Sequence, residues 1–187
     1  MKTIKSILSA TLCLVVICLV VTGAVAGTRY AFSDEILQQE QEQQRKTMSQ
    51  LLKAEDYQLL TKENDEQGQF YQALTAQKVT GYIAVTAAYG YGSDVSVMTA
   101  ITATGQVAGI EILDASQETP GLGQNVTRKD FTEQFREITA APAVTKNTPT
   151  TADEIQAVTG ATRSSNAVAA AVTKALALYD AFAKEGK

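Results

Sequence analysis

An uncharged apolar run near the N-terminus limits what this chain can fold into more than any other feature. No charged residue occurs from Ile7 to Ala26, which is roughly the 20 residues that a helix needs to cross a bilayer. Lys2 and Lys5 precede the run, so the positive-inside rule predicts a cytoplasmic N-terminus and an extracytoplasmic remainder. The alternative is a cleaved signal peptide, because Ala24-Val25-Ala26 fits a small-residue cleavage site. The run exceeds the usual signal core of about 7–15 residues, which favours an uncleaved single-pass anchor in the cell membrane.

Missing residue types exclude several kinds of site. The 187-residue chain has no histidine, and its two cysteines, Cys13 and Cys18, both lie in the apolar run. A Ser-His-Asp triad, a Cys-His dyad, a His-ligated zinc site and a disulfide framework are therefore excluded. The net charge of −4 gives no basic face for nucleic acid. A ligand that carries a phosphate fits this composition better than a metal or a thiol nucleophile.

Composition divides the chain into three segments. Residues 1–27 are predicted to hold the cytoplasmic N-terminus and the anchor, residues 28–56 a helical juxtamembrane stalk, and residues 57–187 one extracytoplasmic domain. From Ser33 to Lys53 the stalk has the pattern of a polar helix with Ser33 as its N-cap. Its apolar residues are sparse and clustered at the ends, which favours a solvated stalk over a coiled coil.

The remaining residues have the pattern of an α+β domain. Short runs of β-branched and aromatic residues predict an antiparallel sheet with strands over 57–61, 69–74, 79–87, 94–102 and 107–113. Thr104-Gly105-Gln106 is typical of a hairpin turn. The residues 130–138 predict a short helix and the residues 139–151 a loop. From Ser165 to Lys184 an apolar stripe predicts a helix that covers the sheet, with Val168, Val172, Ala175, Leu176, Tyr179 and Phe182 on the stripe.

Three polar, glycine-containing segments are candidates for a site. Thr159–Ser165 places hydroxyls and a glycine at a helix start, where free N–H groups and the helix dipole favour a phosphate. Tyr89–Ser93 alternates glycine with aromatic residues, and Glu118–Gly123 is a loop rich in Pro and Gly. Each segment is also explained by a plain turn, with Ser164 or Ser165 as an N-cap in the first case. From the residues alone both interpretations stay open.

The order of these segments carries a resemblance that none of them carries alone. A glycine-tyrosine loop, a hairpin ending in Ile112-Leu113, ETPGLG and then TGAT-x-S-S resemble the covalent FMN-binding domain. That domain occurs in the G subunit of the Rnf-type ion-translocating ferredoxin:NAD oxidoreductase and in the C subunit of the sodium-translocating NADH:quinone reductase. The similarity runs from about Gly81 to Tyr179, and the short chain is more similar to the Rnf protein.

The resemblance implies a covalently bound flavin. In that family the last threonine of an S/T-G-A-T segment carries FMN through a phosphoester bond, and the matching residue is Thr162. A threonine hydroxyl is a weak nucleophile without an adjacent base, and the family uses a separate magnesium-dependent flavin transferase that takes FAD and releases AMP. The other implied cofactor-binding residues are Thr159, Gly160, Ala161 and Ser164 at the phosphate end, and Glu118, Thr119 and Leu122 at the ring or ribityl chain.

Two residues depart from the family pattern. An acid often stands three residues before the S/T of the attachment segment, and here Gln156 occupies that position. Arg163 stands where an aliphatic residue is common, and it either pairs with the FMN phosphate or is solvated.

The implied function is electron transfer within a membrane complex that moves Na⁺ or H⁺, with the other Rnf-type subunits as partners. No independent catalytic centre and no metal are expected. One alternative is a free-standing, membrane-tethered FMN domain that serves another extracellular electron route. A further alternative, of a different class, is a non-redox anchored binding module in which TGAT only caps a helix.

Overall fold

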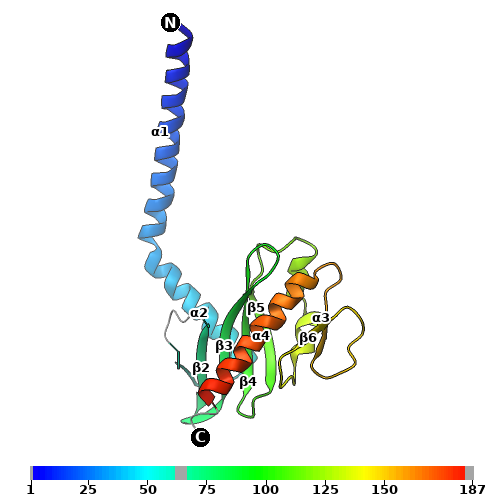
Figure 1. Ribbon diagram of the computed structural model, residues 1–187. Helices are drawn as coiled ribbons and strands as arrows, with labels where there is room; N and C mark the ends of the chain where they lie inside the picture. The colour runs from blue at the N-terminus through cyan, green and yellow to red at the C-terminus, as the bar shows by residue number, and fades with distance from the viewer. Residues whose placement is uncertain (1, 62–66, 184–187) are drawn as a thin grey trace. The chain divides into compact units, whose positions relative to one another are not determined.

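The computed structural model describes residues 2–61 and 67–183, and the chain falls into two units that are described separately (Figure 1). The first unit, Met1–Arg45, contains α1 (Lys2–Ala31) and most of α2 (Ser33–Leu51). The predicted apolar helix is confirmed.

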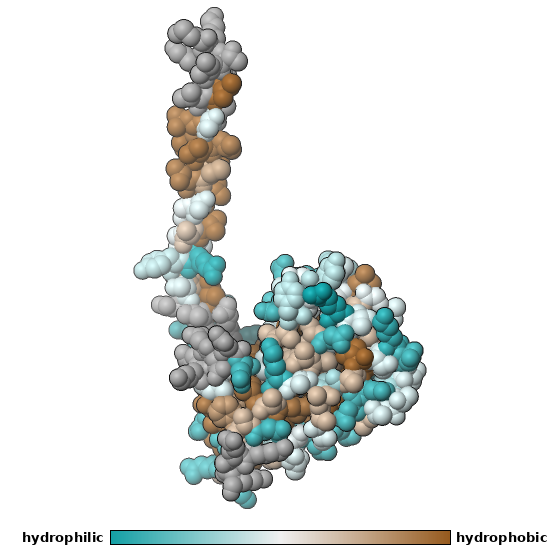
Figure 2. All heavy atoms as spheres, viewed as in Figure 1, coloured by the Kyte–Doolittle hydropathy of each residue, from teal (hydrophilic) through white to brown (hydrophobic). Residues whose placement is uncertain are grey.

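Within α1, the stretch Thr11–Ala31 is long and apolar enough to cross a membrane by its length and composition. Figure 2 shows apolar side chains along this helix. At the end of α1, the Phe32 N–H donates to the Thr28 carbonyl and the Ile36 N–H donates to the Phe32 carbonyl. Because helical hydrogen bonds continue into α2, the N-cap predicted at Ser33 is not needed. The Ser33 hydroxyl donates back to the Tyr30 carbonyl instead.

The second unit, Lys46–Lys187, is built on a five-stranded antiparallel sheet. Its strands follow one another in chain order, each paired with the next, as β1 (Asp56–Leu59), β2 (Gln69–Thr75), β3 (Lys78–Tyr89), β4 (Asp94–Thr102) and β5 (Val107–Asp114). This confirms the predicted antiparallel sheet. The β4–β5 turn closes with Gly105 at a φ of 92°, where its N–H donates to the Thr102 carbonyl.

The C-terminal helix α4 (Thr162–Ala183) covers one face of the sheet (Figure 1). Strand side chains that point to this face, among them Phe70, Ala84 and Val97, form one buried cluster with the apolar stripe of α4. The predicted stripe is buried from Val168 to Tyr179, and Phe182 is 42% exposed. The α+β class with a helix-covered sheet is confirmed.

The opposite face of the sheet is covered by the end of α2. Met48 is buried against Ile83, Met98 and Ala100, and Leu51 and Leu52 pack beside it. This packing explains why the apolar residues of the stalk helix cluster at its C-terminal end. The last part of α2, predicted to belong to the stalk, is therefore part of the core of the second unit.

Smaller elements lie beyond β5. They are the 3-10 helix η1 (Gly123–Thr127), α3 (Lys129–Thr132), the 3-10 helix η2 (Glu133–Phe135), and two short strands, β6 (Ala143–Thr145) and β7 (Glu154–Gln156), which pair in parallel. The helix predicted over 130–138 ends earlier, and the predicted loop over 139–151 contains β6. Strands of three residues are too short to show a periodic pattern in the sequence.

The start of α4 corrects a further prediction. The helix begins at Thr162, three residues before the predicted start. Ser165 is buried inside the first turns, and its hydroxyl accepts the Val158 N–H at 3.0 Å and donates to the Ala161 carbonyl at 3.0 Å. Neither Ser164 nor Ser165 is the N-cap, since both lie within the helix. The hydroxyl of Ser165 instead holds the incoming chain against the helix.

Candidate functional site

The three segments selected from the sequence meet at the start of α4, around one buried carboxylate. One oxygen of Glu118 accepts the N–H groups of Tyr91 at 2.9 Å and Gly92 at 3.1 Å. The other oxygen accepts the hydroxyl of Ser164, in the first turn of α4. Glu118 itself is 1% exposed. The fold thus brings ETPGLG, the loop between β3 and β4, and the TGAT segment into direct contact.

Burial raises the pKa of the Glu118 carboxyl, but hydrogen bonds lower it and outweigh the burial. The donors are the Ser164 hydroxyl and three backbone N–H groups of residues 91–93. The pKa therefore lies below its ordinary value, and the group is a carboxylate at neutral pH.

The ETPGLG segment forms a tight turn at the surface. The Leu122 N–H donates to the Thr119 carbonyl at 3.1 Å, Pro120 precedes Gly121, and Gly121 has a φ of 73°. Pro followed by a residue with positive φ is typical of a type II turn. The turn leaves Leu122 45% exposed and Thr119 half-buried. These two side chains are accessible to a ligand, whereas Glu118 is enclosed by protein.

Thr162 occupies the first helical position of α4 and is half-buried. It borders an open cavity of about 530 Å³ together with Tyr89, Arg163 and Asn166. Of the other predicted phosphate-end residues, Thr159 and Gly160 are exposed, while Ala161 and Ser164 are buried. The structure thus leaves the Thr162 region open to solvent beside the N–H groups that begin a helix.

Arg163 links α4 to the loop between β3 and β4. Its Nε donates to the Gly90 carbonyl at 2.7 Å, and its guanidinium carbon lies 5.7 Å from the centroid of the Tyr89 ring. This distance is within the range of a cation–π interaction. Arg163 is therefore bound to this loop although its side chain is exposed to solvent. No local pattern indicates this contact, because the partners lie more than 70 residues apart.

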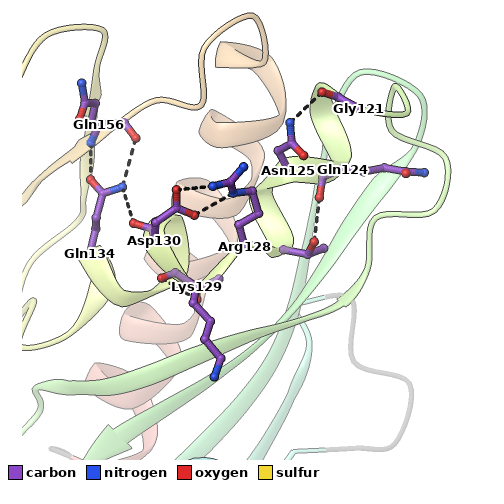
Figure 3. Close-up of polar contacts among 10 residues, drawn as sticks. Gly121, Gln124, Asn125, Arg128, Lys129, Asp130, Gln134 and Gln156 are labelled. Carbon is purple, nitrogen blue, oxygen red and sulfur yellow. Dashed lines mark hydrogen bonds and ion pairs between the residues drawn. The ribbon is translucent and has the colours of Figure 1, made fainter.

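A second cavity of about 620 Å³ is lined by Thr159 of the TGAT segment together with residues of η1, α3 and η2. Figure 3 shows its polar contacts. Arg128 and Asp130 form an ion pair at 3.0 Å, and the Gln156 N–H donates to the side-chain oxygen of Gln134 at 2.8 Å. Gln156 thus joins β7 to η2 through its backbone. No motif in the sequence predicted this cavity.

Comparison with known proteins identifies the family of the domain that contains these three segments. Residues 90–177 match the family model of the FMN-binding domain, and residues 1–51 match that of the RnfG N-terminal region. The G subunit of the proton-translocating ferredoxin:NAD(+) oxidoreductase complex of Clostridium ljungdahlii is 30% identical over 175 residues. This alignment covers 94% of the chain and 92% of that protein. The chain belongs to this G-subunit family.

Other G subunits and two solved structures agree with this assignment. The G subunit of the Na(+)-translocating complex of Acetobacterium woodii is 36% identical over 57% of this chain and 53% of that protein. The crystal structure of NqrC from Shewanella oneidensis has a TM-score of 0.53 at 15% identity and covers 68% of each chain. The C subunit of the Na(+)-translocating NADH-quinone reductase from Parabacteroides distasonis has a TM-score of 0.52 at 19% identity over 62% of each chain. The predicted resemblance is confirmed.

Gly92→Ala is expected to destabilise the folded G-subunit domain, because residue 92 packs directly on backbone. A Cβ at this position would lie 2.1 Å from the Gln117 carbonyl oxygen. Relief of this overlap requires a backbone shift, and overpacking of this kind costs about 1–3 kcal/mol. Chemical denaturation of the full chain measures the loss. Gly109→Ala is the matched control, since a Cβ there meets only Leu51 at 3.6 Å. Equal stability of the two variants would contradict the packing.

Proposed function

We propose that this G-subunit chain is an electron-transfer protein that holds FMN through a phosphoester bond to Thr162. The observation that carries the proposal is the position of Thr162. It begins α4 inside the residues that match the FMN-binding domain, and it lies half-exposed at the border of a cavity. The relatives are subunits of ion-translocating ferredoxin:NAD(+) oxidoreductase complexes, and we extend that assembly to this chain.

The residues around Thr162 fit the phosphate of a flavin nucleotide. The first N–H groups of α4 have no partner within the helix, and the positive end of the helix dipole favours an anion. Arg163 adds a positive charge next to the proposed tether, and Glu118 is separated from that surface by burial. We assign the phosphate end of the flavin to Thr159, Gly160, Ala161 and the backbone of Ser164.

The neighbouring loops offer contacts for the rest of the flavin. Tyr89, Tyr91 and Leu122 are exposed around the three joined segments, and aromatic or aliphatic surfaces of this kind suit a planar ring. Thr119 lies in the same turn as Leu122 and completes the proposed contacts. When bound, FMN supplies the redox chemistry, while the protein fixes its position and its surroundings.

Attachment of the flavin requires a maturation enzyme in this proposal. Among the described residues, Thr162 has no histidine, cysteine or carboxylate hydrogen-bonded to its hydroxyl, so the chain itself supplies no general base. We therefore assign the reaction to a flavin transferase that uses FAD. The Thr162 oxygen bonds to the phosphorus of the FMN moiety, the pyrophosphate bond breaks, AMP leaves, and the transferase takes the hydroxyl proton.

We further propose that α1 anchors the chain in the cell membrane, with the N-terminus cytoplasmic and the FMN-binding domain outside. The apolar stretch of α1 and the two lysines before it support this orientation. The anchor keeps the domain close to the membrane subunits of the complex. The alternative of a free-standing FMN domain predicts that genes for the other subunits are absent from the neighbourhood of this gene.

Mass spectrometry of the chain co-expressed with a flavin transferase tests the proposal. The tryptic peptide that contains Thr162 should be heavier by one FMN less one water, and the yellow colour should survive denaturation. Trypsin cleaves after Lys146 and Arg163, so fragment ions must separate Thr162 from Thr148, Thr150, Thr151 and Thr159. Absence of covalent flavin from the wild-type chain under these conditions would reject the attachment.

A further inference from the structure

Glu118 is a buried carboxylate that no proposed chemical step uses. It is 1% exposed, and among the described residues it forms no ion pair with a lysine or arginine. Removing a carboxylate from water without a partner cation is costly unless hydrogen bonds compensate it. Glu118 obtains this compensation from hydrogen bonds, among them those of the Tyr91 and Gly92 N–H groups and of the Ser164 hydroxyl. A group retained at such a cost points to a specific role.

The bond to Ser164 determines which way the first turn of α4 faces. Residues two positions apart on an α-helix point to nearly opposite sides, because each residue turns the helix by about 100°. Ser164 is buried toward Glu118, so Thr162 points away from it and is half-exposed. Rotation of this turn by two residues, about 200°, would turn Thr162 toward Glu118 and Ser164 away from it.

The hydrogen bonds of Glu118 to the loop at residues 90–93 also restrain the first turn of α4. Glu118 holds the N–H groups of Tyr91 and Gly92, and the adjacent Gly90 carbonyl accepts the Nε of Arg163 at 2.7 Å. A Cβ at Gly90 would lie 2.4 Å from the carboxylate, so loop and carboxylate are in close contact. Glu118 therefore reaches α4 both directly, through Ser164, and indirectly, through the loop and Arg163.

We propose that Glu118 is the positioning residue of the flavin-attachment segment. From beneath the site it sets the rotation of the first turn of α4 and the path of the loop at residues 90–93, and so keeps the Thr162 hydroxyl facing the transferase. The inference rests on the proposed function for its consequence, flavin attachment. The claim that Glu118 keeps these two segments in fixed positions does not depend on flavin attachment.

Three variants of the full chain, co-expressed with the transferase, test this role. In Glu118→Ala the hydrogen bonds are lost, and the fraction of chains with FMN on Thr162 should fall by about tenfold to a hundredfold, as for a misplaced reacting group. Glu118→Gln should attach flavin at close to the wild-type level. Its amide oxygen still accepts both N–H groups, and its NH₂ group donates to Ser164 in place of the reverse bond.

Thr86→Val is the matched control. The Thr86 hydroxyl is also buried and also joins the sheet to α4, where it donates to the Ala171 carbonyl at 2.8 Å. Ala171 lies more than two helical turns from Thr162. This variant loses a buried hydrogen bond of α4 without touching the attachment segment. It should be less stable than wild type and should attach flavin normally.

Hydrogen–deuterium exchange of the same proteins gives a readout that does not depend on flavin. Glu118→Ala should speed exchange in peptides that cover residues 89–93 and 158–166, whereas Thr86→Val should leave both peptides protected. If Glu118→Ala does not fold, Ser164→Ala replaces it and should loosen residues 158–166 while residues 89–93 stay protected. The proposal would be overturned if a folded Glu118→Ala or Ser164→Ala variant kept both wild-type flavin attachment and wild-type protection from exchange. Loss of local protection with no flavin on the wild-type chain would support the positioning and reject the proposed function.

Discussion

Thr162→Ala is expected to abolish covalent flavin attachment while the domain folds normally. The substitution removes the only oxygen to which the phosphorus bonds in the proposed linkage. Thr162 is half-exposed at the start of α4, and its backbone carbonyl, which accepts the Asn166 amide at 2.9 Å, remains in the variant. Alanine has a higher helix propensity than threonine, so the change in stability should stay within about 0.5 kcal/mol. Mass spectrometry of the denatured protein and its visible absorbance measure the attached flavin.

Two controls show whether the hydroxyl itself is responsible. Thr162→Ser keeps a hydroxyl at the same position and should retain covalent flavin. Thr173→Ala changes a threonine of the same helix, whose hydroxyl donates to the Ala169 carbonyl at 2.9 Å, and should also retain it. Covalent flavin in Thr162→Ala would mean that another hydroxyl is the attachment site. Loss in Thr173→Ala would indicate a general effect on α4.

Phe70→Ala is expected to cause the largest loss of folding stability, about 3–5 kcal/mol, because it leaves a cavity in the centre of the core. Phe70 is 0% exposed, and its ring stacks on Tyr82 with centroids 5.3 Å apart and planes 7° from parallel. It also contacts Phe182, near the end of α4, at 5.9 Å. The side chain thus joins β2 and β3 to the helix. Domains have total stabilities of about 5–15 kcal/mol, so the variant should unfold at a much lower denaturant concentration.

Phe182→Ala provides the comparison within the same aromatic cluster. Phe182 is 42% exposed, so its removal withdraws less surface from the core and leaves space that water can fill. Its loss of stability should be clearly smaller than that of Phe70→Ala. Urea denaturation of the full chain in detergent, followed by circular dichroism, measures both. Similar midpoints for the two variants would show that Phe70 is not central to the core.

Local sequence patterns predicted the helices and strands in which apolar residues recur at a regular spacing. The strand at 94–102 and the hairpin at 104–106 were predicted at their observed positions, because alternation and turn residues report directly on local geometry. The stripe from Val168 to Tyr179 predicted the buried face of α4 for the same reason. The short strands β6 and β7 were missed, since three residues are too few to show an alternation of apolar and polar positions.

Part of the candidate site followed from the sequence as well. The order of ETPGLG and TGAT identified the segments, and the family assignment is confirmed by the relatives. The individual roles of Thr162 and the neighbouring residues stay predictions. The contacts of Glu118 and Arg163 within the protein were not predicted, because their partners at Tyr91, Gly92 and Gly90 are 26 or more residues away.

The sequence by itself determined the apolar N-terminal helix, the antiparallel sheet with its covering helix, and the flavin family. These features depend on composition, on the spacing of apolar residues or on a short motif, and residues close together in the chain specify all three. Only the tertiary structure decided that Met48 and its neighbours close the second face of the sheet. It alone also decided that Glu118 is buried against the start of α4, where it binds Ser164 while Thr162 is only half-buried. Such contacts arise when distant segments exclude water together, and no local pattern records which partners meet.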